Sequence, residues 1–285
     1  MNPRYERYDG WAALYNATMG PDYGREQFAA LERLLLPNLP KRAAILDLCC
    51  GTGQLLAPLC EAGYTVTGLD GSTEMLRFAK DNAPSAKLVA EDARTFANPT
   101  AFDAVVSTSA SLNHISCIAD LRSVFENVNL SLRAGGHFLF DLNHPSQLER
   151  WWNGRPTEGE ISSRQAWMIT PEYDAQTSVG KFTVTIHTAP DSQQGSWRAL
   201  LYRLLSLPRF IGLRLSAIDR LDRIEPTWHQ ETLEFPVYGY PVDEVSAQLF
   251  EAGFESVRVE TLDGRPLNEN RAAHFLCQKP GGASL

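Results

Sequence analysis

Ile45-Leu46-Asp47-Leu48-Cys49-Cys50-Gly51-Thr52-Gly53 is the stretch of this sequence that decides its fold. Its apolar residues predict a strand buried on both faces, and a helical pattern at 54–62 follows the glycines directly. Glycines let a turn bend tightly and let its backbone approach a ligand with no Cβ in the way. The first N–H groups of the next helix have no partner inside that helix and can face the ligand. This order of strand, glycine turn and helix predicts a site of the nucleotide-binding kind.

Two well-known nucleotide motifs do not fit the turn. A dinucleotide site needs a third glycine three residues after Gly53, and that position is Leu56. A nucleoside-triphosphate loop needs Gly-Lys-Ser or Gly-Lys-Thr, and neither follows the turn. The sequence therefore argues against both of these ligand classes.

Short apolar runs alternate with helical patterns through the first half of the chain. This alternation is typical of parallel strands joined by helices, so we predict an α/β fold with a Rossmann-like sheet. Ser72 is a suitable N-cap for the helix at 73–82. The predicted strands are 43–48, 64–70, 87–92, 102–109 and 136–143, and the predicted helices are 25–36, 54–62, 73–82 and 118–132.

The pattern changes near residue 145. Alternating polar and apolar residues at 178–189 and 227–238 indicate longer antiparallel strands, and a helix at 242–252 with strands at 254–262 and 272–278 closes the chain. An insert late in such a sheet falls near the carboxyl ends of the strands, where ligands bind. We therefore predict a core of residues 1–144 and 237–280, an inserted, mainly antiparallel β cap at 145–236 that binds the substrate, and a disordered tail at 281–285.

Composition narrows the classes of function. The chain has 285 residues and a formal net charge of −8. An acidic surface repels phosphate backbones, so no nucleic-acid partner is expected. No apolar run approaches the ~18 residues that cross a bilayer, and no signal peptide is recognisable, so we expect a cytoplasmic protein without integral membrane association. The five cysteines lack paired spacing and the histidines do not cluster with carboxylates, so no metal site is expected.

Acidic residues end the second and third predicted strands. Asp70 follows Gly51 by 19 residues, and a carboxylate there can accept both hydroxyls of an adenosine ribose. Asp92 ends the third strand, where a carboxylate can accept the amino group of adenine. Taken singly, Asp70 can be a plain carboxylate in a turn, Asp92 a helix cap and Met75 a core residue. The order of glycine turn, first acid and second acid favours a cofactor site.

With these motifs the chain resembles the class I S-adenosylmethionine-dependent methyltransferases of the small-molecule type, which include sugar N-methyltransferases of antibiotic pathways. The resemblance covers residues 8–143 well and 229–279 more loosely. It implies S-adenosylmethionine as cofactor, with the glycine loop around its methionine part, acids on the ribose and adenine, and an N-terminal segment closing over it. The residues that match the cofactor site are Tyr8, Tyr15, Asp47, Cys49, Gly51, Gly53, Asp70, Gly71, Met75, Asp92, Ala93 and Ser107.

The resemblance also implies a seven-stranded sheet in the order 3-2-1-4-5-7-6, with the last strand antiparallel to the rest. The linker between the last two predicted strands, 263–271, has no room for the crossover helix that parallel strands need. We therefore expect an antiparallel pair at the end of the sheet.

His114, which follows the fourth predicted strand, indicates where the methyl acceptor binds. Sugar N-methyltransferases carry a histidine at the matching place, and an imidazole with a pKa of about 6.5 suits a general base. His114 is therefore the predicted catalytic residue, with helix capping or a backbone hydrogen bond as the alternative. Asn143 and His229 are also expected to face the acceptor, although His229 can equally be a sheet-surface histidine.

These features predict an enzyme that moves a methyl group from S-adenosylmethionine to nitrogen or oxygen of a small-molecule acceptor. Two alternatives stay open: a protein of this fold that uses the cofactor for a non-methylating reaction, and a non-catalytic regulator. The identity of the acceptor and the formation of a homodimer are also open.

The segment 197–223 departs most from the family pattern. Trp197, Leu200, Leu201, Leu204 and Leu205 recur at helical spacing, and arginines interleave with them. One interpretation is an arginine-bearing amphipathic lid that binds a membrane surface or an acidic or lipidic acceptor. The other is a lid or a dimer-interface helix pair with solvated arginines.

Overall fold

The computed structural model describes residues 5–190 and 198–281 of the chain. The chain divides into two compact units, the first formed by Met1–Leu148 and Tyr238–Leu285 and the second by Glu149–Val237. Trp197 and, from residue 282 on, the predicted tail lie outside the described residues. Within the described ranges, every helix is too short or too polar to cross a lipid bilayer.

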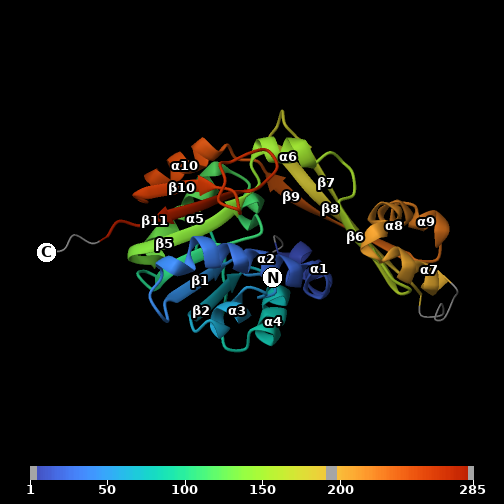
Figure 1. The fold of residues 1–285 in the computed structure, drawn as a ribbon, viewed down its shortest axis with the longest axis horizontal. Helices are drawn as coiled ribbons and strands as arrows, with labels where there is room; N and C mark the ends of the chain where they lie inside the picture. The colour runs from blue at the N-terminus through green and yellow to red at the C-terminus, as the bar shows by residue number, and fades with distance from the viewer. Residues whose placement is uncertain (1–4, 191–197, 282–285) are drawn as a thin grey trace. The chain divides into compact units, whose positions relative to one another are not determined.

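A seven-stranded sheet forms the centre of the first unit (Figure 1). Its strands are β1 (Ala44–Leu48), β2 (Thr65–Asp70), β3 (Lys87–Ala90), β4 (Phe102–Ser107), β5 (Leu132–Leu142), β10 (Ser256–Glu260) and β11 (Ala273–Gln278). They lie in the order β10-β11-β5-β4-β1-β2-β3. Strands β1 to β5 pair in parallel, and β11 is antiparallel to both β5 and β10. The predicted strand order and the antiparallel last strand are confirmed.

Helices cover both faces of this sheet (Figure 1). They are α1 (Glu6–Ala17), α2 (Met19–Leu34), α3 (Leu56–Glu61), α4 (Thr73–Asn82), α5 (Ile118–Ser131) and α10 (Val242–Glu251), with short 3-10 helices η1 (Leu36–Asn38) and η2 (Ser111–His114). Leu46 and Leu48 of β1 belong to the core that contains residues of α5 and α10, whereas Ile45 belongs to the core of α2 and α3. The strand is therefore buried on both faces, as its continuous apolar run predicted.

The N-terminal helices extend further than the sequence indicated. Helix α2 begins at Met19 rather than at residue 25, and α1 was not predicted. Glycine lowers helix propensity, and two glycines stand in the first turns of α2. A Cβ at Gly24 would lie 2.7 Å from the Cβ of Gln54, so this glycine lets α2 pack closely against the residue that follows the glycine turn. Tertiary packing outweighs the local propensity here.

Two strand bounds in the middle of the sheet also differ from the prediction. Strand β4 ends at Ser107 and not at residue 109, because Ser109 and Ala110 take left-handed backbone angles, with φ of 61° and 55°. Strand β5 begins at Leu132, earlier than predicted, and its pairing with β4 shifts register between Phe102 and Ala104. Both differences arise from irregular backbone that an apolar pattern does not reveal.

The second unit contains a four-stranded sheet in the order β6-β7-β8-β9. Its strands are β6 (Glu158–Ile161), β7 (Gln165–Asp174), β8 (Val179–Thr188) and β9 (His229–Tyr238), and β6, β7 and β8 pair antiparallel as predicted for this region. The segment after β8 forms α7 (Arg198–Leu205), η4 (Pro208–Phe210), α8 (Ile211–Ile218) and α9 (Leu221–Ile224), while α6 (Pro145–Trp151) precedes the sheet. Tyr202, Ile218 and Leu221 join these helices to Ile161 and Met168 of the sheet.

Candidate active site

The glycine turn after β1 has two glycines with different tasks. Gly51 and Gly53 both have positive φ, 53° and 75°. A Cβ at Gly53 would lie 2.9 Å from Ala79, so this glycine lets α4 approach the turn. A Cβ at Gly51 would meet nothing within 4 Å, so the backbone there borders open space that a ligand can use. Cys49 takes a φ of 64° without being a glycine, which marks the turn as locally strained.

Asp70 fastens this turn to the start of α4. Its Oδ2 atom accepts the amide of Gly51 at 2.8 Å, and its Oδ1 atom accepts the amide of Ser72 at 2.9 Å. Burial raises the pKa of Asp70, although the backbone hydrogen bonds oppose that shift. Each carboxylate oxygen keeps further acceptor capacity, so Asp70 can also receive the hydroxyls of a ribose.

Three carboxyl groups surround the turn. Asp47 of β1 is 3% exposed, and burial, followed by the charge of Asp70, raises its pKa to about 8. Burial also raises the pKa of the Cys49 thiol, and the charges of Asp70, Asp47 and Asp92 raise it further. A nearby positive charge favours the ionised form of buried acids such as Asp47 and Asp70 and offsets the cost of burying them. The site therefore suits a positively charged ligand.

Substituting Asp47 by asparagine is expected to make the protein more stable at alkaline pH. The pKa of Asp47 is about 8 in the folded chain, above its ordinary value of 3.8, so the folded state binds this proton more tightly than the unfolded state does. Stability from this proton is complete below about pH 4 and is lost as the pH rises through 8. We expect Asp47→Asn to melt at least ~5 °C above the parent at pH 9 and close to it at pH 4. Equal melting temperatures at pH 9 would contradict the shifted pKa.

Asp92 forms a two-pronged ion pair with Arg94 just after β3. The Nε atom of Arg94 donates to Oδ1 of Asp92 at 3.0 Å, and its Nη2 atom donates to Oδ2 at 2.5 Å. Burial opposes ionisation of Asp92, but hydrogen bonds from Arg94 and Tyr5 outweigh it and lower the pKa to about 2. Oδ1 also accepts the Arg94 amide at 2.9 Å, so both carboxylate oxygens of Asp92 already accept hydrogen bonds. Ala93, between the two charged residues, is buried.

The N-terminal helix is tied to α4 by Asp9, which the sequence did not single out. Ser72 caps α4 as predicted, because its Oγ atom accepts the amide of Met75 at 3.1 Å. The same hydroxyl donates to Oδ1 of Asp9 at 2.6 Å, and the amide of Glu74 donates to that oxygen at 3.3 Å. Met75 is buried behind this cap. The contact therefore holds α1 beside the expected cofactor site.

Aromatic side chains of the N-terminal segment gather at the same place. A Cβ on Gly71 would lie 2.1 Å from the ring of Tyr5, so that ring rests directly on the Gly71 backbone. Tyr8 meets the ring of His114 edge to face, with centroids 5.8 Å apart and an interplanar angle of 87°. Tyr15 instead packs against Trp11, with centroids 5.2 Å apart. The structure thus brings Tyr8 to the predicted catalytic histidine and places Tyr15 within an aromatic cluster of the two N-terminal helices.

The segment that carries His114 is held by buried polar side chains. Ser107, at the end of β4, is buried, and the left-handed residue Ala110 donates its amide to Oδ2 of Asp141 at 2.9 Å. Asn113 donates through Nδ2 to the carbonyl oxygens of Asn143 at 2.9 Å and Tyr238 at 2.8 Å. The amide of Asn143 returns a hydrogen bond to Oδ1 of Asn113 at 2.8 Å. Asn113 therefore joins η2 to Asn143 and Tyr238 within the first unit.

Replacing Asn113 by alanine is expected to destabilise the first unit by roughly 1–3 kcal/mol, because buried backbone groups lose their partners. Thermal and urea unfolding of the variant measure this loss. An exposed amide, Asn270, provides the matched control, because its side chain lies at the surface. A variant as stable as the parent would show that water replaces Asn113 at no cost.

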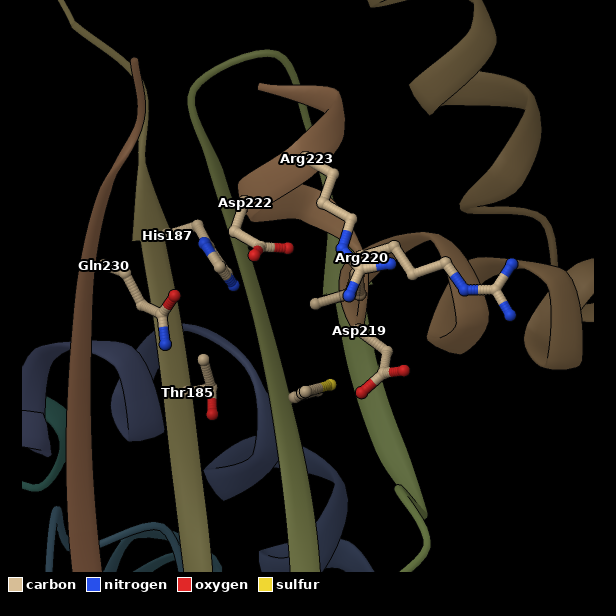
Figure 2. A pocket seen from close by; sticks show the side chains of 9 residues that line it. Thr185, His187, Asp219, Arg220, Asp222, Arg223 and Gln230 are labelled. Atoms are coloured by element: carbon tan, nitrogen blue, oxygen red, sulfur yellow. The ribbon is translucent and has the colours of Figure 1, made fainter. Parts of the chain in front are cut away.

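In the second unit, His229 is not among the residues that line the observed pocket. A pocket of about 340 Å³ is lined by Gln230, the residue after His229. Neighbouring side chains of a strand point to opposite faces, so exposed His229 lies on the other face of β9. Figure 2 shows the pocket between the sheet and the helices that follow it. Its lining residues are Met168, Thr185, His187, Ile218, Asp219, Arg220, Asp222, Arg223 and Gln230.

His187 is one of two buried polar residues that line this pocket, with Thr185, and was not predicted. It is 4% exposed and faces Asp222 in Figure 2. Burial lowers the pKa of His187, although the charge of Asp222 opposes the shift. A neutral imidazole offers one donor and one acceptor, so together with Gln230 and Thr185 the pocket can hydrogen-bond a polar group.

Comparisons with known proteins agree with this geometry. A sequence profile of the methyltransferase domain matches residues 45–136, which hold the glycine turn and both strand-end acids. The dTDP-3-amino-3,6-dideoxy-alpha-D-glucopyranose N,N-dimethyltransferase of Streptomyces fradiae is 35% identical over 147 residues, which cover 52% of this chain and 52% of that protein. An uncharacterized methyltransferase of Synechocystis sp. is 37% identical over 150 residues, covering 51% of this chain and 68% of that protein. The match to the Streptomyces enzyme thus spans about half of its length.

The fold is similar to that of solved methyltransferases over nearly the whole chain. An S-adenosylmethionine-dependent methyltransferase from Clostridium acetobutylicum superposes with a TM-score of 0.69 at 18% identity. The superposition covers 96% of this chain and 99% of that one. The likeness therefore extends to the architecture of both units.

Proposed function

Because this chain belongs to the class I S-adenosylmethionine-dependent methyltransferases, we propose that it transfers a methyl group to nitrogen or oxygen of a small-molecule acceptor. The observation that carries the proposal is the contact of Tyr8 with His114 in η2, the short helix after β4, together with the acids around the glycine turn that suit a cationic cofactor. The relative from Streptomyces fradiae is named for N,N-dimethylation of a nucleotide-linked amino sugar. An amino group on such a sugar is therefore the acceptor to test first.

The residues around the glycine turn fit the cofactor by charge and by shape. S-adenosylmethionine supplies a methyl group on an already activated sulfonium. The protein therefore has to bind the two substrates, orient them toward each other and exclude water. We propose that Asp70 receives the ribose hydroxyls, that the open backbone at Gly51 receives the methionine part, and that buried Met75 packs on the adenine. The carboxyl group of Asp47 then lies near positive charge and ionises when the site is filled.

We propose that His114 takes the proton that the acceptor atom loses. An amine that is methylated must present its lone pair, so a base that holds the departing proton favours the reaction. The edge-to-face contact with Tyr8 limits rotation of the imidazole. The hydrogen bonds of the Asn113 side chain to Asn143 and Tyr238 fix the backbone next to it. A non-methylating reaction or a purely regulatory role is not favoured, because the matching relatives are named as methyltransferases.

Acceptor use can be measured with methyl-labelled cofactor and matched sugar nucleotides. The panel contains a nucleotide-linked amino sugar, its hydroxyl counterpart and the free amino sugar, and mass spectrometry counts the methyl groups gained. We expect methylation of the amino sugar nucleotide in preference to the hydroxyl counterpart. Cofactor binding without a methylated product from any small molecule, including those of a cell extract, would contradict the proposal and favour the regulator.

A further inference from the structure

Exposed apolar side chains of the described residues gather in one segment of the second unit. Of the eleven large hydrophobic side chains that are exposed, seven lie between Leu200 and Ile224. Leu200 is 75% exposed and Leu213 is 63% exposed, values unusual for leucines in a helical segment. The exposed leucine face is defined here as Leu200, Leu201, Leu204, Leu207, Ile211 and Leu213.

The residues of this face come from two short helices and the connection between them. Leu200, Leu201 and Leu204 lie in α7, Leu207 lies in the connection, and Ile211 and Leu213 lie in α8. The opposite side of the same helices supplies the core of the unit through Tyr202, whose hydroxyl donates to Oε1 of buried Glu225 at 2.6 Å. The helices are therefore fixed by packing that does not involve the exposed leucine face.

Positive charge accompanies this face. Between Arg198 and Ile218 the sequence contains four arginines and no acidic residue, although the whole chain has a net charge of −8. Arg203 and Arg209 are exposed, and the guanidinium of Arg209 lies 4.8 Å from the centre of the Phe210 ring. Arg214 donates through Nη1 to the carbonyl oxygen of Ser206 at 2.9 Å and helps to fix the bend after α7.

We propose that the exposed leucine face docks on an anionic lipid surface. Leucine side chains bury their apolar area at the boundary of head groups and acyl chains, while arginines keep their charge among anionic head groups. A second copy of the chain fits less well, because a twofold pair through this face would bring the arginines of both copies together without an acidic partner. The contact is peripheral, and it is independent of which small molecule is methylated.

Vesicle flotation of the full chain tests this docking. We expect the protein to float with vesicles of phosphatidylcholine and phosphatidylglycerol but not with vesicles of phosphatidylcholine alone, and to be released by high salt. Arg203→Gln and Arg209→Gln should each weaken partitioning by about fivefold. Leu200→Ser with Leu204→Ser should weaken it by more than ~10-fold. The matched controls are Leu130→Ser and Phe250→Ser, because these residues are 49% and 52% exposed elsewhere on the chain.

Each outcome decides the proposal. Absence of flotation with anionic vesicles, or equal flotation of the leucine double variant, overturns it. Equal flotation with neutral vesicles contradicts the part assigned to the arginines. If the leucine substitutions instead abolish a concentration-dependent dimer seen by sedimentation, a second copy covers the face and the lipid assignment is wrong. The arginine variants keep the test decisive if the leucine double variant does not fold.

Discussion

Replacement of His114 by alanine is expected to lower the turnover number by ~10²- to 10⁴-fold, the usual contribution of a general base. The affinity for S-adenosylmethionine should stay nearly unchanged. The reason is positional: the glycine turn and the strand-end acids follow β1, β2 and β3, whereas His114 ends η2, which follows β4. The methyl group moves in line from donor to acceptor, so a residue in the segment after β4 can serve the acceptor without holding the donor.

Steady-state kinetics and calorimetric titration with the cofactor measure the two effects separately. Ser116→Ala is the matched control, because it removes an exposed side chain two residues after His114. A loss of turnover well below tenfold would leave His114 only an orienting role. A marked loss of cofactor affinity with normal turnover per bound cofactor would place His114 in the cofactor site and overturn the proposed arrangement.

The parts of the fold that depend on local pattern were predictable from the sequence. The apolar run of β1, the glycine turn and the helix at 73–82 follow from hydrophobic periodicity and from an N-cap three residues before Met75. The antiparallel last strand follows from a linker too short for a crossover helix. In each case the deciding residues are neighbours in the chain, and their physical preferences coincide with the final structure.

The connections that complete the site were not predictable, because their partners lie far apart in the sequence. Asp9 reaches Ser72 across 63 positions, and Asn113 reaches Tyr238 across 125. Ser109 and Ala110 adopt left-handed backbone angles although neither is a glycine. The sequence therefore did not predict the backbone conformation before His114. The ion pair of Arg94 with Asp92 joins residues only two positions apart, but the strand pattern did not indicate it.

Asp70→Ala is expected to weaken S-adenosylmethionine binding by ~10²- to 10³-fold, because the residue has two separate tasks. Its carboxylate is proposed to accept hydrogen bonds from the ribose hydroxyls, and these hydrogen bonds are charge-assisted. It also holds the amides of Gly51 and Ser72 at 2.8 and 2.9 Å, so its removal releases the glycine turn from the start of α4. Asp70→Asn should give an intermediate loss, since one oxygen remains to accept a hydrogen bond while the charge and the second acceptor are gone.

Calorimetry with S-adenosylmethionine and with its demethylated product, on protein shown to be folded, measures this effect. Both ligands carry the same ribose, so both should lose affinity, whereas a residue that recognises only the sulfonium charge would affect the methyl donor alone. Asp81→Ala is the matched control, because it removes an exposed carboxylate from α4. If Asp70→Ala binds both ligands as tightly as the parent, Asp70 is only a carboxylate that shapes a turn, and the ribose must be held elsewhere.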